Sequence, residues 1–491
     1  MIGEKPFTLT LSPESAGIPS EAVRRFIERI DRKQICMHGF LLVRYGQIAA
    51  EGYWSPYTPD RLHRMYSVSK SFVSLAVGLL IDEGKLALGD RVADYFPDKV
   101  PQDMHRWLAE ATVRDLLLMA TPHSDLTYGV HDLDWSWCFF NKKPSHPAGT
   151  IFCYDTAATV VLSAIVERIC GMPFLEYMRP RLLDPIGASK DVWCIRTPEG
   201  PSWGGSGVLC TLRDLAKTAY VCLNKGRWGD HQLISEDYIT AATSKQIDNR
   251  LSGNVGYGYQ IWREKENGFS FRGMGSQLAM CFPDKDFIFT CISDTQGSGA
   301  TGSGIYEAMW EELFPYLADG SLPEQPEEKK KLQEKIGQLQ ILPQAGAHDS
   351  PLSERIHDRW YHLEDNVMGI TRSKLTFAQD SVRWSYTNAQ GDNELEFGLG
   401  ACLPGLFPQK NYFGGQIGQI PGKRYECLSS AAWVEPSKLD LLVYVTDDYL
   451  GTLKMTMAFK DNEVSIHMVK VAEWFLNEYE GFAGGSLAES D

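Results

Sequence analysis

The hydrophobic pattern changes its period near residue 350, and one fold class cannot accommodate both halves of the chain. Up to about residue 318, segments with helical spacing of apolar residues alternate with a few short strand-like runs. From about residue 350, apolar and polar residues alternate in short runs separated by turn residues such as Gln390-Gly391-Asp392. These runs predict strands over residues 375–386, 394–399, 439–445, 452–459 and 464–469. We therefore expect an α+β region over residues 1–318 and a small all-β domain, a barrel or a sandwich, over residues 350–491.

Residues 319–349 lie between these two regions, and we expect them to form a linker that carries one charged helix. Residues 319–326 are punctuated by Gly and Pro, which favours irregular backbone. Residues 327–340 are rich in Glu and Lys and follow Pro326, a residue suited to the first turn of a helix.

The composition excludes several classes of partner. Of the 491 residues, 43% are hydrophobic and 23% are charged, as in an ordinary globular protein. The formal net charge of −15 opposes binding to nucleic acid and to anionic membranes. No apolar stretch reaches the roughly 18 residues that span a bilayer. We expect neither nucleic acid nor a membrane as a partner.

The N-terminus and the cysteines indicate the compartment. The first six residues lack the basic start and apolar run of a secretory signal. The 11 cysteines are scattered, and no Cys-x-x-Cys pair occurs among them. This pattern is typical of free thiols in a reducing compartment and not of disulfides or a zinc site. We expect a cytoplasmic protein without a bound metal.

Five strands and several helices are predicted in the first region. The expected strands are residues 39–43, 47–53, 269–273, 277–282 and 287–293. The last three are joined by short connections, which force antiparallel pairing. A helix is expected from Ser67 to a C-terminal cap at Gly84, and the closing helix is expected over residues 305–317.

The chemistry is suggested by one motif. Ser67 and Lys70 form the only Ser-x-x-Lys sequence of the chain, at the predicted start of a helix. Their spacing puts both side chains on one helix face. A serine hydroxyl needs a neighbouring base, and lysine serves only if its pKa falls from about 10.4 towards 7, a cost of roughly 4 kcal/mol. The alternative interpretation is that Ser67 caps the helix and Lys70 is a solvated lysine.

The segments around this motif resemble the Ser-x-x-Lys serine hydrolases, among them class C β-lactamases, DD-peptidases, D-aminopeptidases, β-lactamase-fold carboxylesterases and nylon-oligomer hydrolases. The resemblance covers roughly residues 15–318 and implies a β-lactamase/transpeptidase-like domain, in which helices and a helical subdomain flank an antiparallel sheet. The segments that carry it, in chain order, are residues 66–72, 84–90, 113–117, 147–154, 204–215 and 271–277.

The resemblance and the chemistry together imply the roles of individual residues. Ser67 is the nucleophile that forms an acyl-enzyme, Lys70 is the general base and Tyr154 is the proton relay. The backbone N–H groups of Ser67 and Met274 form the oxyanion hole. The predicted substrate contacts are Thr156, Arg272, Gly273, Tyr66 and Trp262.

Two departures from the family pattern indicate the substrate class. Thr156 stands where the family's Tyr-x-Asn motif has its amide, and Phe271 stands where its third motif has Lys or His. Phe271 cannot bind a carboxylate, and neighbouring residues on a strand face opposite sides, which leaves the direction of Arg272 open. The pattern resembles the esterase and nylon-oligomer hydrolase members, so efficient β-lactamase activity is not expected.

No cofactor is expected. Residues 297–302 fit the dinucleotide pattern Gly-x-Gly-x-x-Gly, but no second parallel strand follows them. The expected partner is a small-molecule ester or amide, and the chain is a possible homo-oligomer. Two alternatives stay open, namely an acyltransferase, and a binding or sensor module that acylates slowly or not at all.

Overall fold

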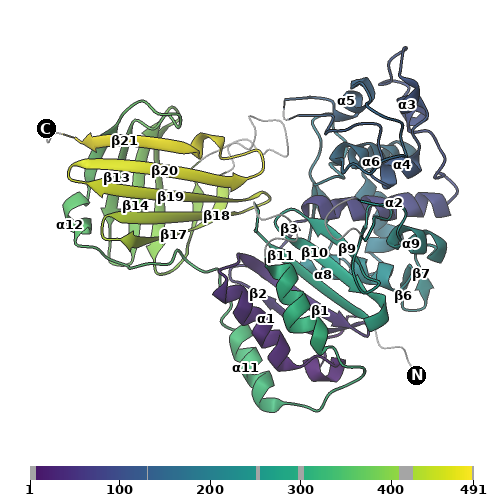
Figure 1. Cartoon of the computed structure of the whole chain (residues 1–491), viewed down its shortest axis with the longest axis horizontal. Helices are drawn as coiled ribbons and strands as arrows, with labels where there is room; N and C mark the ends of the chain where they lie inside the picture. Colours follow the sequence, from purple (N-terminus) through teal and green to yellow (C-terminus); the bar gives the residue numbers. More distant parts are fainter. Residues whose placement is uncertain are drawn as a thin grey trace. The chain divides into compact units, whose positions relative to one another are not determined.

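The computed structural model describes residues 7–488 except 11, 130, 250–254, 297–303 and 409–423. The chain divides into two compact units, Met1–Gln340 and Ile341–Asp491 (Figure 1). Residues 297–302, which carry the Gly-x-Gly-x-x-Gly pattern, lie outside the described residues.

The central sheet of the first unit has the strand order β2-β1-β11-β10-β9-β8, with every neighbouring pair antiparallel. The predicted strands over residues 269–273, 277–282 and 287–293 are confirmed as β9, β10 and β11. The strands of this unit are β1 (Met37–Arg44), β2 (Gln47–Tyr53), β3 (His63–Arg64), β4 (Trp193–Cys194), β5 (Val208–Cys210), β6 (Arg227–Trp228), β7 (His231–Gln232), β8 (Trp262–Arg263), β9 (Phe269–Gly273), β10 (Gln277–Phe282) and β11 (Phe287–Ser293).

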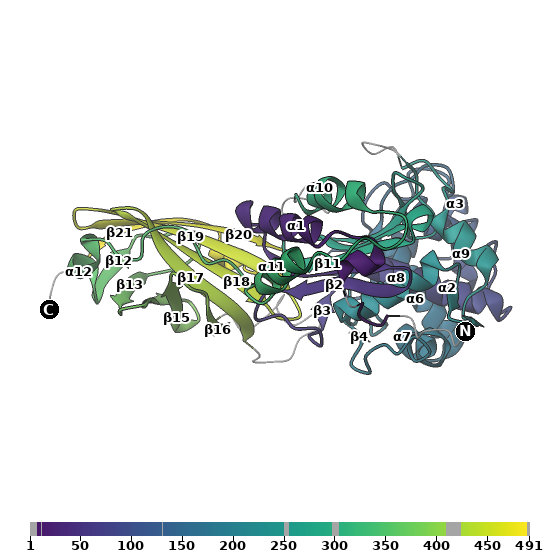
Figure 2. The same ribbon diagram turned by 90° about the horizontal axis from the view of Figure 1, so that it is seen from below.

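Helices cover both faces of this sheet (Figures 1 and 2). Successive residues of a strand face opposite sides, and Gly39 and Phe40 of β1 show which helix lies on which side. A side chain at Gly39 would meet Leu212 of α8, whereas the ring of Phe40 packs on Phe26 of α1. All eight residues of β1 are buried, as expected for a strand enclosed on both faces.

Most of the other helices form a helical subdomain beside the sheet, centred on α2, whereas α10 and α11 pack against α1. Twelve of the 14 residues of α2 are buried, so it is enclosed on all sides. The helices of the unit are α1 (Ser20–Arg32), α2 (Ser69–Asp82), α3 (Arg106–Ala109), α4 (Val113–Leu117), α5 (Trp135–Asn141), α6 (Thr156–Cys170), α7 (Phe174–Met178), α8 (Leu212–Leu223), α9 (Glu236–Thr243), α10 (Ile305–Ala308) and α11 (Pro326–Ile336).

No single helix within the described residues is long and apolar enough to cross a membrane. Only α6 together with residues 174–183 passes that test, as a pair bent by 64°.

The predicted closing helix over residues 305–317 is not continuous. It consists of α10, a π-helical segment η6 (Met309–Leu313) and a 3-10 segment η7 (Phe314–Tyr316). Pro315 lies within η7, and because proline lacks a backbone N–H and crowds the preceding turn, it prevents a regular helix there.

The charged helix expected in the linker is present as α11 and belongs to the first unit. It packs against α1, where Arg24 forms an ion pair with Glu328 at 3.0 Å and Asp31 forms one with Lys335 at 2.5 Å. In the structure, the division between the units follows Gln340.

The second unit is an all-β barrel. Its strand order is β15-β14-β13-β12-β21-β20-β19-β18-β17-β16, and the ring closes because β15 also pairs with β17. The run predicted as one strand over residues 375–386 is instead divided between β13 and β14. The elements of this unit are α12 (Leu352–Ile356), β12 (Arg359–Leu363), β13 (Arg372–Phe377), β14 (Ser381–Asn388), β15 (Gly391–Leu399), β16 (Leu403–Phe407), β17 (Tyr425–Glu435), β18 (Lys438–Thr446), β19 (Leu450–Lys460), β20 (Glu463–Ala472) and β21 (Gly481–Leu487).

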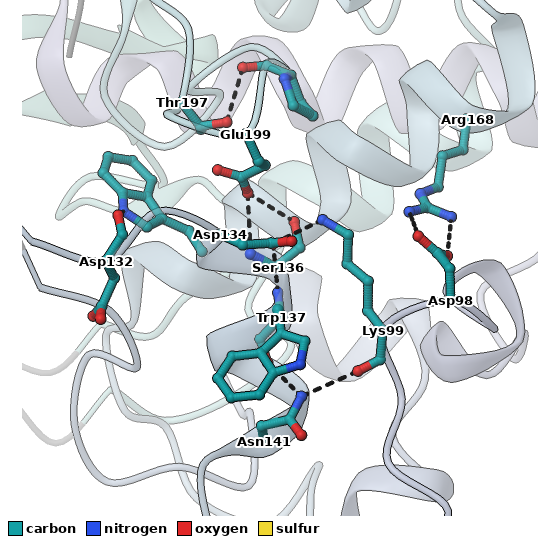
Figure 3. Close-up of polar contacts among 12 residues, drawn as sticks. Asp98, Lys99, Asp132, Asp134, Ser136, Trp137, Asn141, Arg168, Thr197 and Glu199 are labelled. Carbon is teal, nitrogen blue, oxygen red and sulfur yellow. Dashed lines mark hydrogen bonds and ion pairs between the residues drawn. The ribbon is translucent and has the colours of Figure 1, made fainter. Parts of the chain in front are cut away.

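A polar network holds α5 in the helical subdomain (Figure 3). Asp134 accepts a hydrogen bond from Trp137 N–H at 2.9 Å, which caps the helix, and one from Lys99 Nζ at 2.7 Å. Glu199 Oε1 accepts a bond from Ser136 N–H at 3.1 Å, and Asn141 donates to the Lys99 carbonyl at 3.1 Å. The segment around Lys99 is therefore tied to both ends of α5.

We expect the cap and not the ion pair to account for most of what Asp134 contributes. Its side chain is 40% exposed, which weakens the pair with Lys99. Asp134→Ala should lower the free energy of unfolding by about 1–2 kcal/mol, whereas Asp134→Asn, which keeps the cap acceptor, should lose less than about 0.5 kcal/mol. Urea unfolding followed by tryptophan fluorescence measures both, and equal losses in the two variants would contradict the assignment.

Candidate active site

Ser67 lies in a tight 3-10 turn, η2 (Tyr66–Val68), directly before α2. The turn is held from both sides, since Met65 N–H donates to the Val208 carbonyl at 2.8 Å and Ser69 Oγ accepts from Val208 N–H at 2.9 Å. Tyr66 has a positive φ of 47°, which L-residues adopt only under tertiary constraint. The predicted helix thus begins two residues later than expected, at Ser69.

Lys70 points at Ser67. Its Nζ donates to Ser67 Oγ at 2.9 Å and to the Gly205 carbonyl at 2.7 Å, and the residue is only 1% exposed. The alternative interpretation of Lys70 as a solvated lysine is therefore wrong. Gly205 packs closely on Thr156, because a side chain there would lie 2.5 Å from Thr156 Cγ2. Thr156 thus lies beside the loop that supplies the second acceptor of Lys70.

Tyr154 completes the cluster around the Lys70 amine. The centre of its ring lies 4.9 Å from Lys70 Nζ, and its ring stacks on Trp262 with centroids 5.4 Å apart. Although 38% of the residue is exposed, its hydroxyl lies beside Ser67, and loss of hydration there raises the pKa of Tyr154 to about 12. A hydrogen bond with Ser67 acts in the opposite direction. At neutral pH Tyr154 is a phenol and not a phenolate.

Asp155, between Tyr154 and Thr156, is a buried carboxyl group. Its Oδ1 caps α6 by accepting from Ala157 N–H at 2.8 Å, and its Oδ2 accepts from Thr121 Oγ1 at 3.2 Å. Burial raises the pKa of Asp155 to about 6, although these hydrogen bonds and the charge of Lys70 lower it in part. Asp155 thus orients the segment that presents Tyr154.

The end of β9, where its turn to β10 begins, lies against η2, the turn that carries Ser67. A side chain at Gly273 would lie 2.4 Å from the Met65 carbonyl, so only glycine permits this approach of β9 to η2. The buried amide of Gln277 holds the turn, with Nε2 donating to the carbonyls of Met274 at 2.9 Å and Ser293 at 2.7 Å. Its Oε1 accepts from Ser293 N–H at 3.1 Å. Gln277 therefore holds the Met274–Gly275 peptide, which directly follows the N–H of Met274.

Arg272 is engaged by a carboxylate of the protein. Its Nε and Nη2 both donate to Glu264 Oε1, at 3.0 and 2.5 Å, and its guanidinium carbon lies 5.4 Å from the centre of the Trp262 ring. Since Trp262 stacks on Tyr154, these residues form one continuous wall beside the reactive cluster.

The predicted site residues lie around Ser67, and Tyr66 is the one whose predicted substrate contact the geometry does not support. Tyr66 is only 1% exposed, with the Arg64 guanidinium 4.3 Å above the centre of its ring, and this geometry does not support a contact with substrate. Four further residues of the site were not predicted from the sequence, namely Gly205, Asp155, Glu264 and Gln277. Asp155 was detectable as an N-cap residue. Gly205, Gln277 and Glu264 make contacts that only the folded chain reveals: with Lys70, with Ser293 and with Arg272 and Tyr306, respectively.

No group of three or more His, Cys, Asp or Glu residues within the described residues is arranged to hold a metal ion.

The family model described as Beta-lactamase matches residues 24–313 of the chain. Among curated proteins, the 6-aminohexanoate-dimer hydrolase of Paenarthrobacter ureafaciens is 26% identical over 265 residues, which is 48% of this chain and 67% of that protein. A beta-lactamase of Yersinia enterocolitica is 27% identical over 227 residues, which is 43% of this chain and 53% of that protein.

Solved structures show the same fold. A putative 6-aminohexanoate-dimer hydrolase from Bacillus anthracis aligns with a TM-score of 0.51 at 18% identity, covering 63% of this chain and 85% of that one. EstCE1, described as a hydrolase with promiscuous acyltransferase activity, aligns with a TM-score of 0.50 at 15% identity, covering 59% of this chain and 99% of that one.

The raised pKa of Asp155 predicts a pH-dependent stability. Because its pKa is higher in the folded state, at about 6, than the ordinary value of 3.8, the carboxyl contributes most to stability below pH 3.8 and loses that contribution as pH rises through 6. Asp155→Asn, which cannot ionise, should therefore gain up to about 3 kcal/mol relative to wild type between pH 4 and pH 7.5. Urea unfolding of both proteins at the two pH values tests this, and a constant difference would contradict it.

Proposed function

This chain belongs to the Beta-lactamase family of serine hydrolases, and we propose that it cleaves a carboxylic ester or a small amide through an acyl-enzyme on Ser67. One observation carries the proposal: a buried lysine amine donates to the hydroxyl of Ser67 and to the Gly205 carbonyl. Such an amine is placed to take the proton of the hydroxyl as it attacks.

The positions of the groups support the following reaction. Ser67 Oγ attacks the substrate carbonyl carbon, and its proton passes to Lys70 Nζ. The backbone N–H groups of Ser67 and Met274 donate hydrogen bonds to the carbonyl oxygen and stabilise the negative charge that develops on it. Tyr154, held as a phenol, donates its proton to the leaving oxygen or nitrogen and is reprotonated from Lys70. Water then attacks the acyl-enzyme by the reverse proton transfers and releases the acid.

The substrate class follows from the residues that replace the family's polar groups. Thr156 offers no amide to an acylamido group, and Phe271 is fully buried and carries no charge, so neither supports penicillin recognition. The names of two similar proteins, a 6-aminohexanoate-dimer hydrolase and a hydrolase with promiscuous acyltransferase activity, support a small amide or ester as substrate. The second also supports acyl transfer when another nucleophile replaces water.

A fluorophosphonate probe and an activated aryl ester test the proposal. Wild type should gain the mass of one phosphonyl group and release the phenol, whereas Ser67→Ala and Lys70→Met should lose at least about 10³-fold in rate. Ser71→Ala is the matched control, because Ser71 is on the same helix and donates to the Gln260 carbonyl at 2.9 Å. Equal labelling of wild type and Ser67→Ala would contradict the hydrolase and favour a binding or sensor module.

We expect Gln277 to affect kcat because it holds the Met274 carbonyl and so helps to fix the position of the Met274 N–H. Gln277→Leu removes both donors that hold the β9–β10 turn and should lower kcat roughly 10–100-fold, with KM changed only a few-fold. Gln277→Glu keeps the acceptor for Ser293 N–H but not the donors, so it should behave like the leucine variant. An unchanged kcat in a folded Gln277→Leu protein would contradict the assignment of Met274 to the oxyanion hole.

A further inference from the structure

Glu264 is a buried carboxylate with a complete set of donors. Its side chain is 1% exposed. Oε1 accepts from Ser270 Oγ at 2.5 Å and from two nitrogens of Arg272, and Oε2 accepts from Tyr306 hydroxyl at 2.9 Å. A carboxylate so enclosed requires a cation beside it, because an uncompensated charge at such depth is costly.

The cation that compensates Glu264 belongs to the wall of the candidate active site. Arg272 directly precedes Gly273 on β9, the glycine that lies against Met65 beside the nucleophile. The Arg272 side chain is 18% exposed and lies between the rings of Trp262 and Tyr306, at 5.4 and 5.8 Å from their centres. Trp262 in turn stacks on Tyr154. The guanidinium is thus held beside the site and paired inside the protein.

We propose that Glu264 is a specificity-determining residue: by pairing with Arg272 it makes the Trp262 side of the active site electrically neutral, so that the enzyme selects substrates that are uncharged there. This rests on the proposed hydrolase function and names its substrate class. Phe271, the neighbouring position of the strand, is apolar and buried, so it supplies no second cation for an anionic group.

Two physical effects favour this selection. A substrate carboxylate near Arg272 is attracted by the guanidinium and repelled by Glu264, which lies behind that guanidinium. The attraction and the repulsion largely cancel, whereas the cost of desolvating the carboxylate remains. An uncharged group avoids that cost and gains contact with the aromatic surfaces of Trp262 and Tyr154. The substrate class is therefore a neutral ester or amide with an apolar or aromatic group at this position.

The first experiment uses wild-type protein and charge-matched substrates. In the acyl series, 4-nitrophenyl pentanoate and the methyl ester of 4-nitrophenyl glutarate are compared with 4-nitrophenyl hydrogen glutarate. In the leaving-group series, phenyl acetate is compared with 4-carboxyphenyl acetate. We expect kcat/KM for the anionic substrate to be at least about tenfold lower than for its neutral partners in at least one series. Equal values, or a preference for the anion, in both series would overturn the inference.

The second experiment removes the compensating charge. Glu264→Gln should raise kcat/KM for the disfavoured anionic ester at least about tenfold relative to its neutral partner, mainly through KM, because Arg272 is then unpaired. The double variant Glu264→Gln/Arg272→Gln should lose that gain. An unchanged ratio in Glu264→Gln would overturn the role of Glu264. If no ester is turned over in a Ser67-dependent manner, the proposed function itself fails. Turnover without charge discrimination defeats only this inference.

Discussion

The pair of hydrogen bonds from Lys70 Nζ to Ser67 Oγ and the Gly205 carbonyl is the contact around which the first unit is arranged. It requires the first turn of α2 to lie beside the loop at Gly205, and the Val208 backbone, bonded to Met65 and Ser69, holds those two segments together. It also requires burial, which α2 provides because helices and sheet enclose it. Burying a lysine amine costs the fold free energy, and such groups cluster at functional sites.

The sequence predicts the parts of this arrangement that depend on local spacing. Ser67 and Lys70 are three residues apart, so one helical turn brings them together. The strands over residues 269–293 are short, largely apolar runs separated by turns, so they could be placed to the residue. Gly205, Gln277 and Glu264 were not predicted because each acts through a partner that only the fold supplies. The amide of Gln277, for example, joins two carbonyls that are 19 residues apart in the chain.

The barrel shows the same limit on a larger scale. The strands that alternate, β18 to β20, were predicted, whereas β17 and β21 were not. β17 is buried over seven consecutive residues, because β15 and β16 both pair with it where the barrel closes, and this removes the alternation on which the prediction relies. β21 contains three glycines, which sequence rules assign to turns. The all-β class was nevertheless predicted from the strands that do alternate.

The charged side chains near Ser67 are expected to decide which substrates this fold accepts. Lys70 lies beside the ring of Tyr154, which stacks on Trp262, and the nearby Arg272 is paired with Glu264. The central claim is that the Ser67 hydroxyl, activated by Lys70, forms the covalent bond to substrate beneath the N–H groups of Ser67 and Met274. A crystal structure of the phosphonylated protein tests it most directly. The account predicts phosphorus bonded to Ser67 Oγ with one oxygen within hydrogen-bond distance of both N–H groups. Phosphorus on another residue, or that oxygen turned towards solvent, would contradict the account.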